Sequence, residues 1–143
     1  MKKKTLAIIP ARYGSKRIKN KNIKNFFGKP IIYYAIERAI KSKIFSDIIV
    51  STDSKRIAKI SNKFGAKTPF LRSKKLSDDK TNTISVVTDA INQMEKIGKK
   101  YEFVCCIYPA NPFLNPKDIA KAYKIIKSEK KINYVVTGIS YQH

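Results

Sequence analysis

Ile8-Ile9-Pro10-Ala11-Arg12-Tyr13-Gly14-Ser15-Lys16-Arg17 is the stretch that decides the fold. The apolar residues Leu6 to Ile9 end at a proline, and a polar loop follows with five cations, Arg12, Lys16, Arg17, Lys19 and Lys21. No helical or alternating period of apolar residues runs through this loop. We therefore interpret it as a loop at the carboxyl end of a buried strand, where open α/β sheets bind their ligands.

This loop has the composition of a polyphosphate site. Gly14 lets the backbone approach a ligand or adopt a positive φ, and cations with free backbone N–H groups suit phosphate oxygens. Lysine is frequent throughout the chain, so the five cations could also be background charge. Two other phosphate-binding motifs are excluded. A P-loop needs Ser or Thr after its Gly-Lys pair, but Gly28-Lys29 is followed by Pro30. A dinucleotide-binding fingerprint needs a series of glycines, but Gly14 stands alone.

The bulk composition predicts one globular domain over residues 1–143. Hydrophobic residues make up 43% of the chain, which is typical of a globular rather than a disordered protein. No apolar run approaches the roughly 18 residues that a membrane span needs. The apolar run after Met1-Lys2-Lys3-Lys4 is too short for a signal peptide. We expect a cytoplasmic protein with no membrane partner.

The net charge of +21 raises the question of a nucleic-acid ligand. The lysines are spread over every segment, however, and many fall on the expected solvent faces of helices, such as Lys121, Lys124, Lys127 and Lys130. We therefore expect no nucleic-acid partner. The adjacent Cys105 and Cys106 would point to opposite faces of a strand, so we expect reduced packing residues. His143 is the single histidine, which gives no support to a zinc site or a Cys–His catalytic pair.

Periodicity and local signals predict alternating strands and helices. Strands are expected at residues 5–10, 48–50, 103–108 and 134–137, and helices at 30–42, 55–64, 83–97 and 116–128. Asp53 or Ser54 can cap the second helix, and Gly65 and Gly98 can end the second and third. Asn115 and Pro116 form a typical start for the last helix. The continuous apolar run at 103–108 favours a central strand buried on both faces. Right-handed crossovers make this a three-layer α/β/α, Rossmann-like parallel sheet.

At these motifs a family resemblance appears. The residues Ile-Pro-Ala-Arg-Tyr-Gly-Ser-Lys-Arg, then Lys21-Asn22-Ile23 and Gly28-Lys29-Pro30, resemble the opening of the acylneuraminate cytidylyltransferase family, and most of all its pseudaminic acid branch. Further similar stretches, in order, are Val50-Ser51-Thr52-Asp53, Pro69-Phe70-Leu71-Arg72 and Cys105-Cys106-Ile107-Tyr108-Pro109. The resemblance implies a nucleotide-diphospho-sugar transferase type of fold. It also implies that residues 1–143 correspond to the amino-terminal, nucleotide-binding part of a longer, single cytidylyltransferase domain.

The resemblance implies a reaction in which CTP transfers CMP to a nonulosonic acid and pyrophosphate leaves, for cell-surface glycan biosynthesis. Such a step depends on positioning and on neutralising the negative charge of the leaving group. Arg12, Lys16 and Lys21 occupy the matching positions and are the expected catalytic residues. The backbone groups of Ala11, Gly14 and Ser15 would line the same pocket.

The resemblance implies that five further side chains bind the nucleotide or the substrate. Some of them could instead have a purely structural role. Asn22 would contact the ribose. Arg72 would contact the nucleotide, although its spacing alone suggests a surface cation. Thr81 and Thr83 could either cap a helix or contact the cytosine. Tyr108 replaces the glutamine of sialic acid enzymes, which favours pseudaminic acid, although it could also pack in the core.

The acidic residues suggest no metal site within this chain. Asp78 and Asp79 are expected in a solvated loop, and Asp53 as a cap or strand-end residue. Mg²⁺ is expected with a nucleoside triphosphate, but the aspartates that bind it in the resembled family correspond to positions beyond residue 143. Full-length family members are expected to be homodimers. Legionaminic acid, sialic acid or Kdo remain alternative substrates, and a non-catalytic basic nucleotide-binding domain remains an alternative function.

Overall fold

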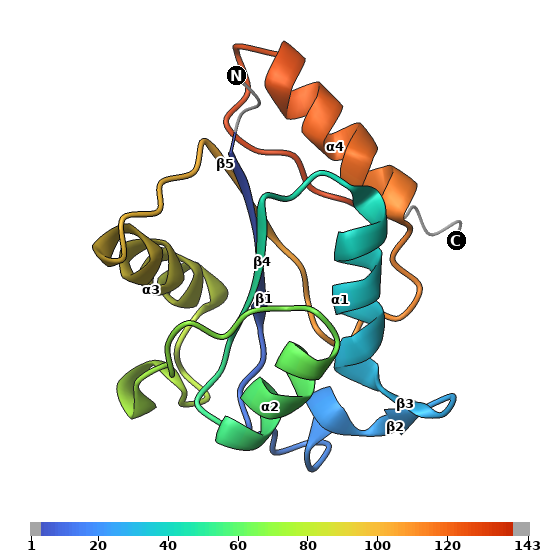
Figure 1. The fold of residues 1–143 in the computed structure, drawn as a ribbon, viewed down its shortest axis with the longest axis vertical. Helices are drawn as coiled ribbons and strands as arrows, with labels where there is room; N and C mark the ends of the chain where they lie inside the picture. The colour runs from blue at the N-terminus through green and yellow to red at the C-terminus, as the bar shows by residue number, and fades with distance from the viewer. Residues whose placement is uncertain (1–3, 139–143) are drawn as a thin grey trace.

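The computed structural model describes residues 4–138 (Figure 1). A parallel sheet has the strand order β4-β1-β5, with β1 in the centre. Its strands are β1 (Thr5–Pro10), β4 (Asp47–Ser51) and β5 (Phe103–Cys106), and a small antiparallel hairpin is formed by β2 (Asn25–Phe26) and β3 (Lys29–Pro30). The helices are α1 (Ile31–Ser42), α2 (Lys55–Lys63), α3 (Thr83–Lys96) and α4 (Pro116–Ser128), with short 3₁₀ turns η1 (Lys21–Ile23) and η2 (Lys74–Leu76).

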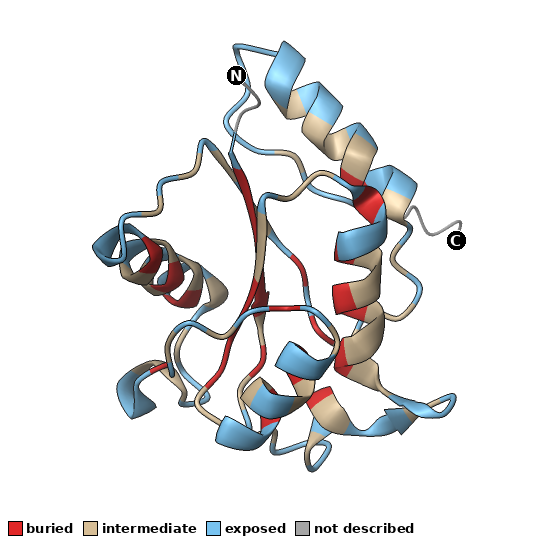
Figure 2. Ribbon diagram, in the orientation of Figure 1, coloured by how far each residue is buried: buried red, intermediate tan, exposed pale blue. Residues whose placement is uncertain are grey.

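Alternate residues of β1 build two hydrophobic cores, one on each face of the sheet. Ala7 and Ile9 pack against apolar residues of α1, α2 and α4. Leu6 and Ile8 pack against α3. Figure 2 shows buried residues along β1 and on the helix surfaces that face it. This two-sided packing follows from the period-2 geometry of a strand, and it confirms the predicted three-layer α/β/α fold.

Local sequence signals placed the helix ends correctly. The Ser54 hydroxyl accepts a 3.3 Å hydrogen bond from the Ile57 N–H, so Ser54 rather than Asp53 caps α2. Gly65 follows α2 with φ of +96°, and a Cβ there would lie 3.2 Å from the Ile40 side chain. Asn115 caps α4 by accepting a 3.0 Å bond from the Lys117 N–H, with proline at the first helical position. These ends are set by residues within one turn, which is why the sequence reveals them.

Two strand predictions are wrong. β5 is not the central strand: it pairs with β1 on one side, and no other strand within residues 4–138 pairs with it. Val104 is accordingly 37% exposed and Cys106 is also exposed. Residues 134–137 form no strand, and Tyr134 and Val136 are largely exposed. An apolar run indicates affinity for a core, but it does not say which neighbour will cover it.

The hairpin before α1 was not predicted. Pro30 lies in β3 and precedes α1, rather than occupying its first turn. The turn between the two strands has Phe27 at φ 46° and Gly28 at φ 80°, and the Asn25 side chain accepts a 2.9 Å bond from the Gly28 N–H. Each strand is only two residues long, so no alternating pattern could reveal it.

The two cysteines are free, as expected, but only one of them packs in the core. Cys105 lies against the hydrophobic core on the α1 side, and burial raises the pKa of its thiol to about 11. Cys106 is exposed, which corrects its assignment as a packing residue. His143 lies outside the described residues. No helix in the described part of the chain is long and apolar enough to cross a membrane.

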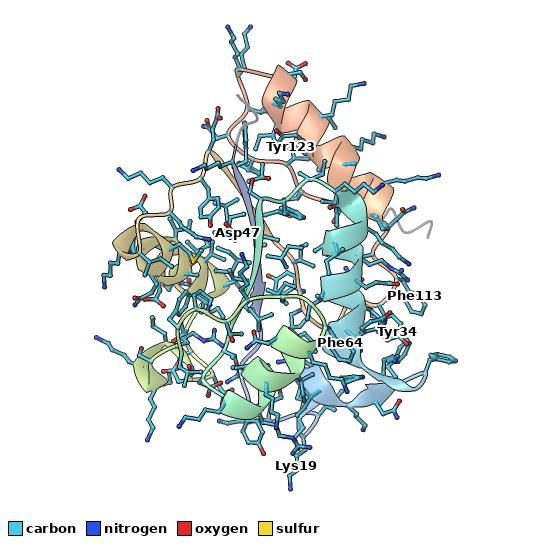
Figure 3. All side chains as sticks on the ribbon, viewed as in Figure 1. Lys19, Tyr34, Asp47, Phe64, Phe113 and Tyr123 are labelled. Carbon is cyan, nitrogen blue, oxygen red and sulfur yellow. The ribbon has the colours of Figure 1, made fainter. Side chains whose placement is uncertain are left out.

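A polar cluster around Asp47, which Figure 3 labels, joins the start of β4 to the segment after α2 and to the segment before β5. The Asp47 carboxylate accepts hydrogen bonds from Tyr101 Oη at 2.7 Å, from Lys67 Nζ at 2.8 Å and from Lys99 Nζ at 3.1 Å. Burial alone would raise the pKa of Asp47, but these three donors outweigh it and lower the pKa to about 2. Burial and the Asp47 carboxylate both raise the pKa of the Tyr101 phenol. The cluster is therefore a charge-assisted structural contact at the end of the sheet away from the polar loop.

Candidate functional site

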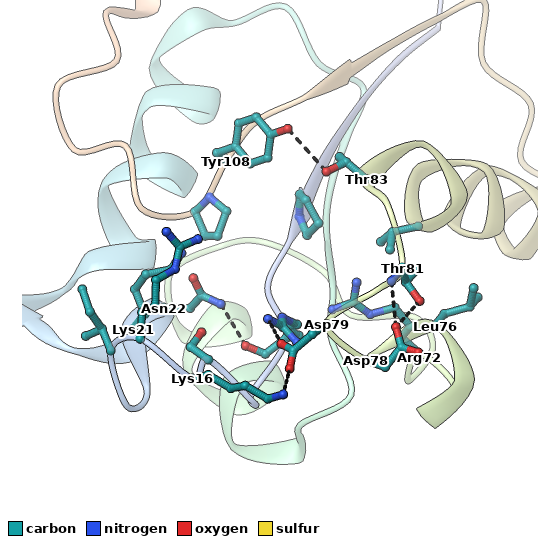
Figure 4. A pocket seen from close by; sticks show the side chains of 17 residues that line it. Lys16, Lys21, Asn22, Arg72, Leu76, Asp78, Asp79, Thr81, Thr83 and Tyr108 are labelled. Carbon is teal, nitrogen blue, oxygen red and sulfur yellow. Dashed lines mark hydrogen bonds and ion pairs between the residues drawn. The ribbon is translucent and has the colours of Figure 1, made fainter.

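A cavity of about 220 Å³ lies at the carboxyl ends of β1 and β5 (Figure 4). Its walls come from the loop after β1, from η1, from the segment between α2 and α3, from the start of α3 and from the residues after β5. This is the edge at which parallel α/β sheets bind ligands. Nine of the eleven predicted site residues line it, namely Arg12, Ser15, Lys16, Lys21, Asn22, Arg72, Thr81, Thr83 and Tyr108.

Three hydrogen bonds hold the loop after β1 in place. The Ala11 N–H donates to the Ser51 carbonyl at 2.9 Å, and the Tyr13 N–H donates to Asp53 Oδ1 at 2.8 Å. From η1, the Asn22 side-chain amide donates to the Arg12 carbonyl at 2.9 Å. The backbone on both sides of Arg12 is therefore fixed, and the guanidinium is directed into the cavity. Asp53 acts here as a strand-end residue, one of its two predicted roles.

Arg12 and Lys16 form ion pairs with the same carboxylate. Arg12 Nη2 contacts Asp79 Oδ1, and Lys16 Nζ contacts Asp79 Oδ2. Lys16 and Arg12 together hold the pKa of Asp79 below its ordinary value. The Lys16 side chain is 82% exposed, so its pair with Asp79 is accessible to solvent. The cavity thus contains two cations that share one internal anion.

Arg72 is the most unusual group in the cavity. Its side chain is buried, with 6% of the residue exposed, and Nε and Nη2 have no hydrogen-bond partner in the part of the chain that the structure describes. Its backbone N–H donates to the Thr52 carbonyl at 2.8 Å, which fixes its place beside the end of β4. Burial lowers the pKa of the guanidinium, and the nearby Asp53 partly opposes this. A buried, unpaired guanidinium is costly, so an anionic ligand would complete this site. The surface-cation alternative is wrong.

The hydroxyl-bearing side chains lie at the start of α3 and after β5. Asn82 caps α3 by accepting a 2.8 Å bond from the Ser85 N–H, so neither predicted threonine is the cap. Thr81 Oγ1 lies 2.6 Å from Asp78 Oδ1. Thr83 Oγ1 lies 3.4 Å from the Tyr108 hydroxyl. Tyr108 is 61% exposed, which excludes its core-packing alternative. Thr83 and Tyr108 therefore present paired hydroxyls to the cavity (Figure 4).

This combination of fold and polar cavity agrees with a comparison against known families, in which the model described as Cytidylyltransferase matches residues 6–142. The chain belongs to the cytidylyltransferase family.

Curated members of the cytidylyltransferase family are similar along the chain. The pseudaminic acid cytidylyltransferase of Campylobacter jejuni is 44% identical over 139 residues, which is 96% of this chain and 60% of that protein. The CMP-N,N'-diacetyllegionaminic acid synthase of Legionella pneumophila is 38% identical over 135 residues, covering 94% of this chain and 58% of the relative. The chain therefore spans about three fifths of the length of these relatives.

A solved structure of a CMP:2-keto-3-deoxy-manno-octonic acid synthetase, complexed with CTP, has the same fold. It superposes with a TM-score of 0.72 at 24% identity, over 87% of this chain and 48% of the other. At this sequence identity the similarity supports the fold alone, a parallel sheet with helices on both faces.

Two residues predicted to contact a ligand through their backbone do not line the cavity. Ala11 is fully buried and its N–H is already bonded to the Ser51 carbonyl, so it cannot serve a ligand. Gly14 does not line the cavity, and its φ is not positive. A Cβ at Gly14 would meet nothing within 4 Å. The fold therefore does not require glycine there, and the predicted backbone contact at Gly14 finds no support in the cavity.

Asp79 is the main cavity residue that sequence reasoning missed. Asp78 and Asp79 lie in an exposed loop, as predicted, but the Asp79 side chain also contacts two cations, which the sequence did not reveal. The available signal was an acidic pair, Asp78-Asp79, in a chain with only 10 acidic residues against 31 basic ones. Arg17, Leu76 and Val86 also line the cavity.

Three acidic side chains in and near the cavity have partners within the described residues. Residues 4–138 contain no group of three or more His, Cys, Asp or Glu side chains that could hold a metal. Asp79 is paired with cations, Asp78 accepts hydrogen bonds from Thr81, and Asp53 accepts one from Tyr13. The expected role of Mg²⁺ remains a prediction, and no catalytic step is derived from it.

Proposed function

We propose that this chain provides the CTP-binding site of a cytidylyltransferase that transfers CMP to a nonulosonic acid and releases pyrophosphate. The observation that carries this proposal is the buried Arg72, whose Nε and Nη2 have no hydrogen-bond partner among the described residues, in a cavity that also holds Arg12 and Lys16. Together with Arg17 and Lys21, five cationic residues line this cavity, which suits a triphosphate.

In the proposed reaction, the anomeric hydroxyl of the sugar acid attacks the α-phosphorus of CTP. An oxygen–phosphorus bond forms, the bond from the α-phosphorus to the bridging oxygen of the β-phosphate breaks, and the electron pair leaves with pyrophosphate. The cationic side chains Arg12, Lys16 and Lys21 would neutralise the charge that develops on this leaving group. Arg72 would bind a phosphate oxygen from the buried side of the cavity.

The nucleoside has candidate partners on the other walls. Asn22 Oδ1 is buried and finds no hydrogen-bond donor within the described residues, so it could accept from a ribose hydroxyl. Thr81 is already bonded to Asp78 through both its N–H and its hydroxyl. Thr83 and Tyr108 are therefore better placed than Thr81 to contact the cytosine.

Pseudaminic acid is the sugar acid that we favour. The Campylobacter jejuni relative named for it is 44% identical, and Tyr108 stands where the resembled sialic acid enzymes have glutamine. Legionaminic acid is the second candidate, because the Legionella pneumophila relative named for a legionaminic acid derivative is 38% identical. A requirement for Mg²⁺, a cytoplasmic location and a homodimeric full-length enzyme remain predictions.

Isothermal titration calorimetry with CTP, UTP and ATP tests the nucleotide proposal. We expect CTP to bind most tightly, and equal affinities would remove the claim of base recognition. A single-stranded RNA of equal total phosphate serves as the comparison across a salt series. Tighter binding of RNA than of CTP, with a steep loss of affinity as salt rises, would instead indicate a basic nucleic-acid-binding domain.

A further inference from the structure

Asp79 lies where an anionic ligand would lie. Its two carboxylate oxygens contact different cations, Oδ1 meeting Arg12 and Oδ2 meeting Lys16 (Figure 4). Two oxygens of a phosphate group could bridge these cations in the same manner. All three side chains line the cavity, so a polyphosphate that reached both cations would have to replace the Asp79 carboxylate.

The loop that carries Asp79 does not depend on this ion pair for its shape. Asp78 accepts hydrogen bonds from the Lys80 N–H at 3.1 Å and from the Thr81 N–H at 2.7 Å. The Ser77 hydroxyl donates to the Ser73 carbonyl at 2.8 Å. These bonds fix residues 73–81 through neighbours of Asp79. The Asp79 side chain can therefore turn away from the two cations while the loop keeps its conformation.

The ion pairs of Asp79 also differ from those of a structural carboxylate. Asp47 has 11% of its side chain exposed and holds a fixed phenol as well as two lysines. The Asp79 side chain is 32% exposed, and its partner Lys16 is almost fully in solvent. Exposed pairs are weak and exchange readily, which suits a contact that must open when a ligand arrives.

We propose that Asp79 is an internal competitor for the polyphosphate subsite, holding Arg12 and Lys16 in the ligand-free protein and yielding them to a ligand of higher charge. This inference depends on the proposed function only in that the cavity binds a polyphosphate. The carboxylate keeps the two cations close together in the empty site, where they would otherwise repel each other. When pyrophosphate leaves, the carboxylate returns and opposes its rebinding.

The competitor has a consequence for specificity. A carboxylate offers one negative charge to two cations, whereas pyrophosphate or a triphosphate offers several charges and more oxygens. Inorganic monophosphate carries fewer charges than pyrophosphate and therefore competes less well with the carboxylate for the two cations. Asp79 is therefore expected to lower the affinity for every anion that must displace it by a common factor, so that only the more highly charged polyphosphates still bind well. It acts through Arg12 and Lys16 as a positioning residue rather than touching the reacting atoms.

The test uses inorganic pyrophosphate and inorganic monophosphate as probes, titrated by calorimetry into the wild-type chain and into Asp79→Asn. Removing the competitor should tighten pyrophosphate binding by about twofold to thirtyfold, the range expected from the loss of two exposed ion pairs. Monophosphate binding should tighten by a similar factor, because monophosphate must displace the same carboxylate. Asp79→Glu keeps the charge and should restore affinities near those of the wild type.

Glu95→Gln is the matched control, because it removes one carboxylate charge from an exposed position on α3 that does not line the cavity. An equal gain in Glu95→Gln would show a general effect of net charge and would overturn the proposal. Unchanged or weaker pyrophosphate binding in Asp79→Asn would overturn it as well. Should Asp79→Asn fail to fold, Asp79→Ser takes its place with the same expected gain. Pyrophosphate carries no base, so this result can be interpreted even if the chain shows no preference for CTP over UTP and ATP.

Discussion

The side-chain amide of Asn22 donates a hydrogen bond of 2.9 Å to the backbone carbonyl of Arg12. Through this bond η1 holds the polar loop after β1 in the conformation that directs the Arg12 guanidinium into the cavity. The other amide atom, Oδ1, is buried beside the cavity and has no partner among residues 4–138. One side chain thus stabilises the loop with its donor and offers its acceptor to a ligand.

Asn22→Ala should therefore lower both stability and affinity. Loss of a buried hydrogen bond predicts a decrease of about 1–3 kcal/mol in the free energy of unfolding, and loss of the acceptor predicts CTP binding about tenfold weaker. Urea denaturation and calorimetry measure the two effects separately. Asn92→Ala, at an exposed position of α3, should change neither by much. Normal CTP affinity in a destabilised Asn22→Ala would show that Oδ1 does not contact the nucleotide.

Arg12→Ala and Lys16→Ala should each weaken CTP binding while leaving the fold intact. A charge-assisted contact contributes roughly 1.5–3 kcal/mol, so the expected loss is about tenfold to a hundredfold. Lys124→Ala removes the same charge from an exposed position of α4 and should have little effect. If all three variants weaken CTP binding alike in calorimetry, the attraction is diffuse and the assignment of Arg12 and Lys16 is wrong.

Arg72→Met should stabilise the ligand-free protein and weaken its binding of CTP. Methionine fills a similar volume without a buried, unpaired charge, and removal of that unsatisfied group is expected to raise the free energy of unfolding by about 1–3 kcal/mol. CTP affinity should fall at least about tenfold. Arg56→Met, on the exposed face of α2, is the control and should lack both effects. A lower melting temperature in Arg72→Met would show that the guanidinium is already satisfied in the empty site.

Features set by neighbouring residues could be read from the sequence. The caps at Ser54 and Asn115 and the stop at Gly65 each depend on residues within a turn, and the apolar period of each helix reports the face that it buries. The order of these elements was enough to predict the three-layer sheet. The place of the polar loop at the cavity could be predicted because its polar residues directly follow a buried strand.

Features set by distant residues could not be read in this way. The ion pair between Arg12 and Asp79 joins residues far apart in sequence, and the acidic pair Asp78-Asp79 does not by itself show which cations it would meet. Arg72 follows exposed Leu71 in sequence, yet the fold buries it beside the end of β4. The exposure of Val104 likewise depends on which strands lie beside β5, and a local apolar run carries no such information.

The Asp47 cluster should make stability fall as the pH is lowered into the acid range. The pKa of Asp47 is about 2 in the folded protein, against an ordinary value of 3.8. A carboxylate with a lowered folded-state pKa contributes stability that is fully present above its unfolded pKa and is lost as the pH falls toward the folded one. Asp47→Asn should therefore reduce the free energy of unfolding by about 1–2 kcal/mol at neutral pH.

The difference between Asp47→Asn and the wild type should shrink as the pH falls from about 4 toward about 2, the window between the two pKa values. Urea denaturation at a series of pH values measures this difference in the free energy of unfolding. Glu95→Gln is the control, and its difference from the wild type should not shrink over the same pH range. Tyr101→Phe removes one of the donors and should show a smaller version of the same dependence, because Lys67 and Lys99 still hold the carboxylate. A destabilisation by Asp47→Asn that stays constant from neutral pH down to about pH 3 would mean that the cluster acts through packing rather than through the charge of Asp47.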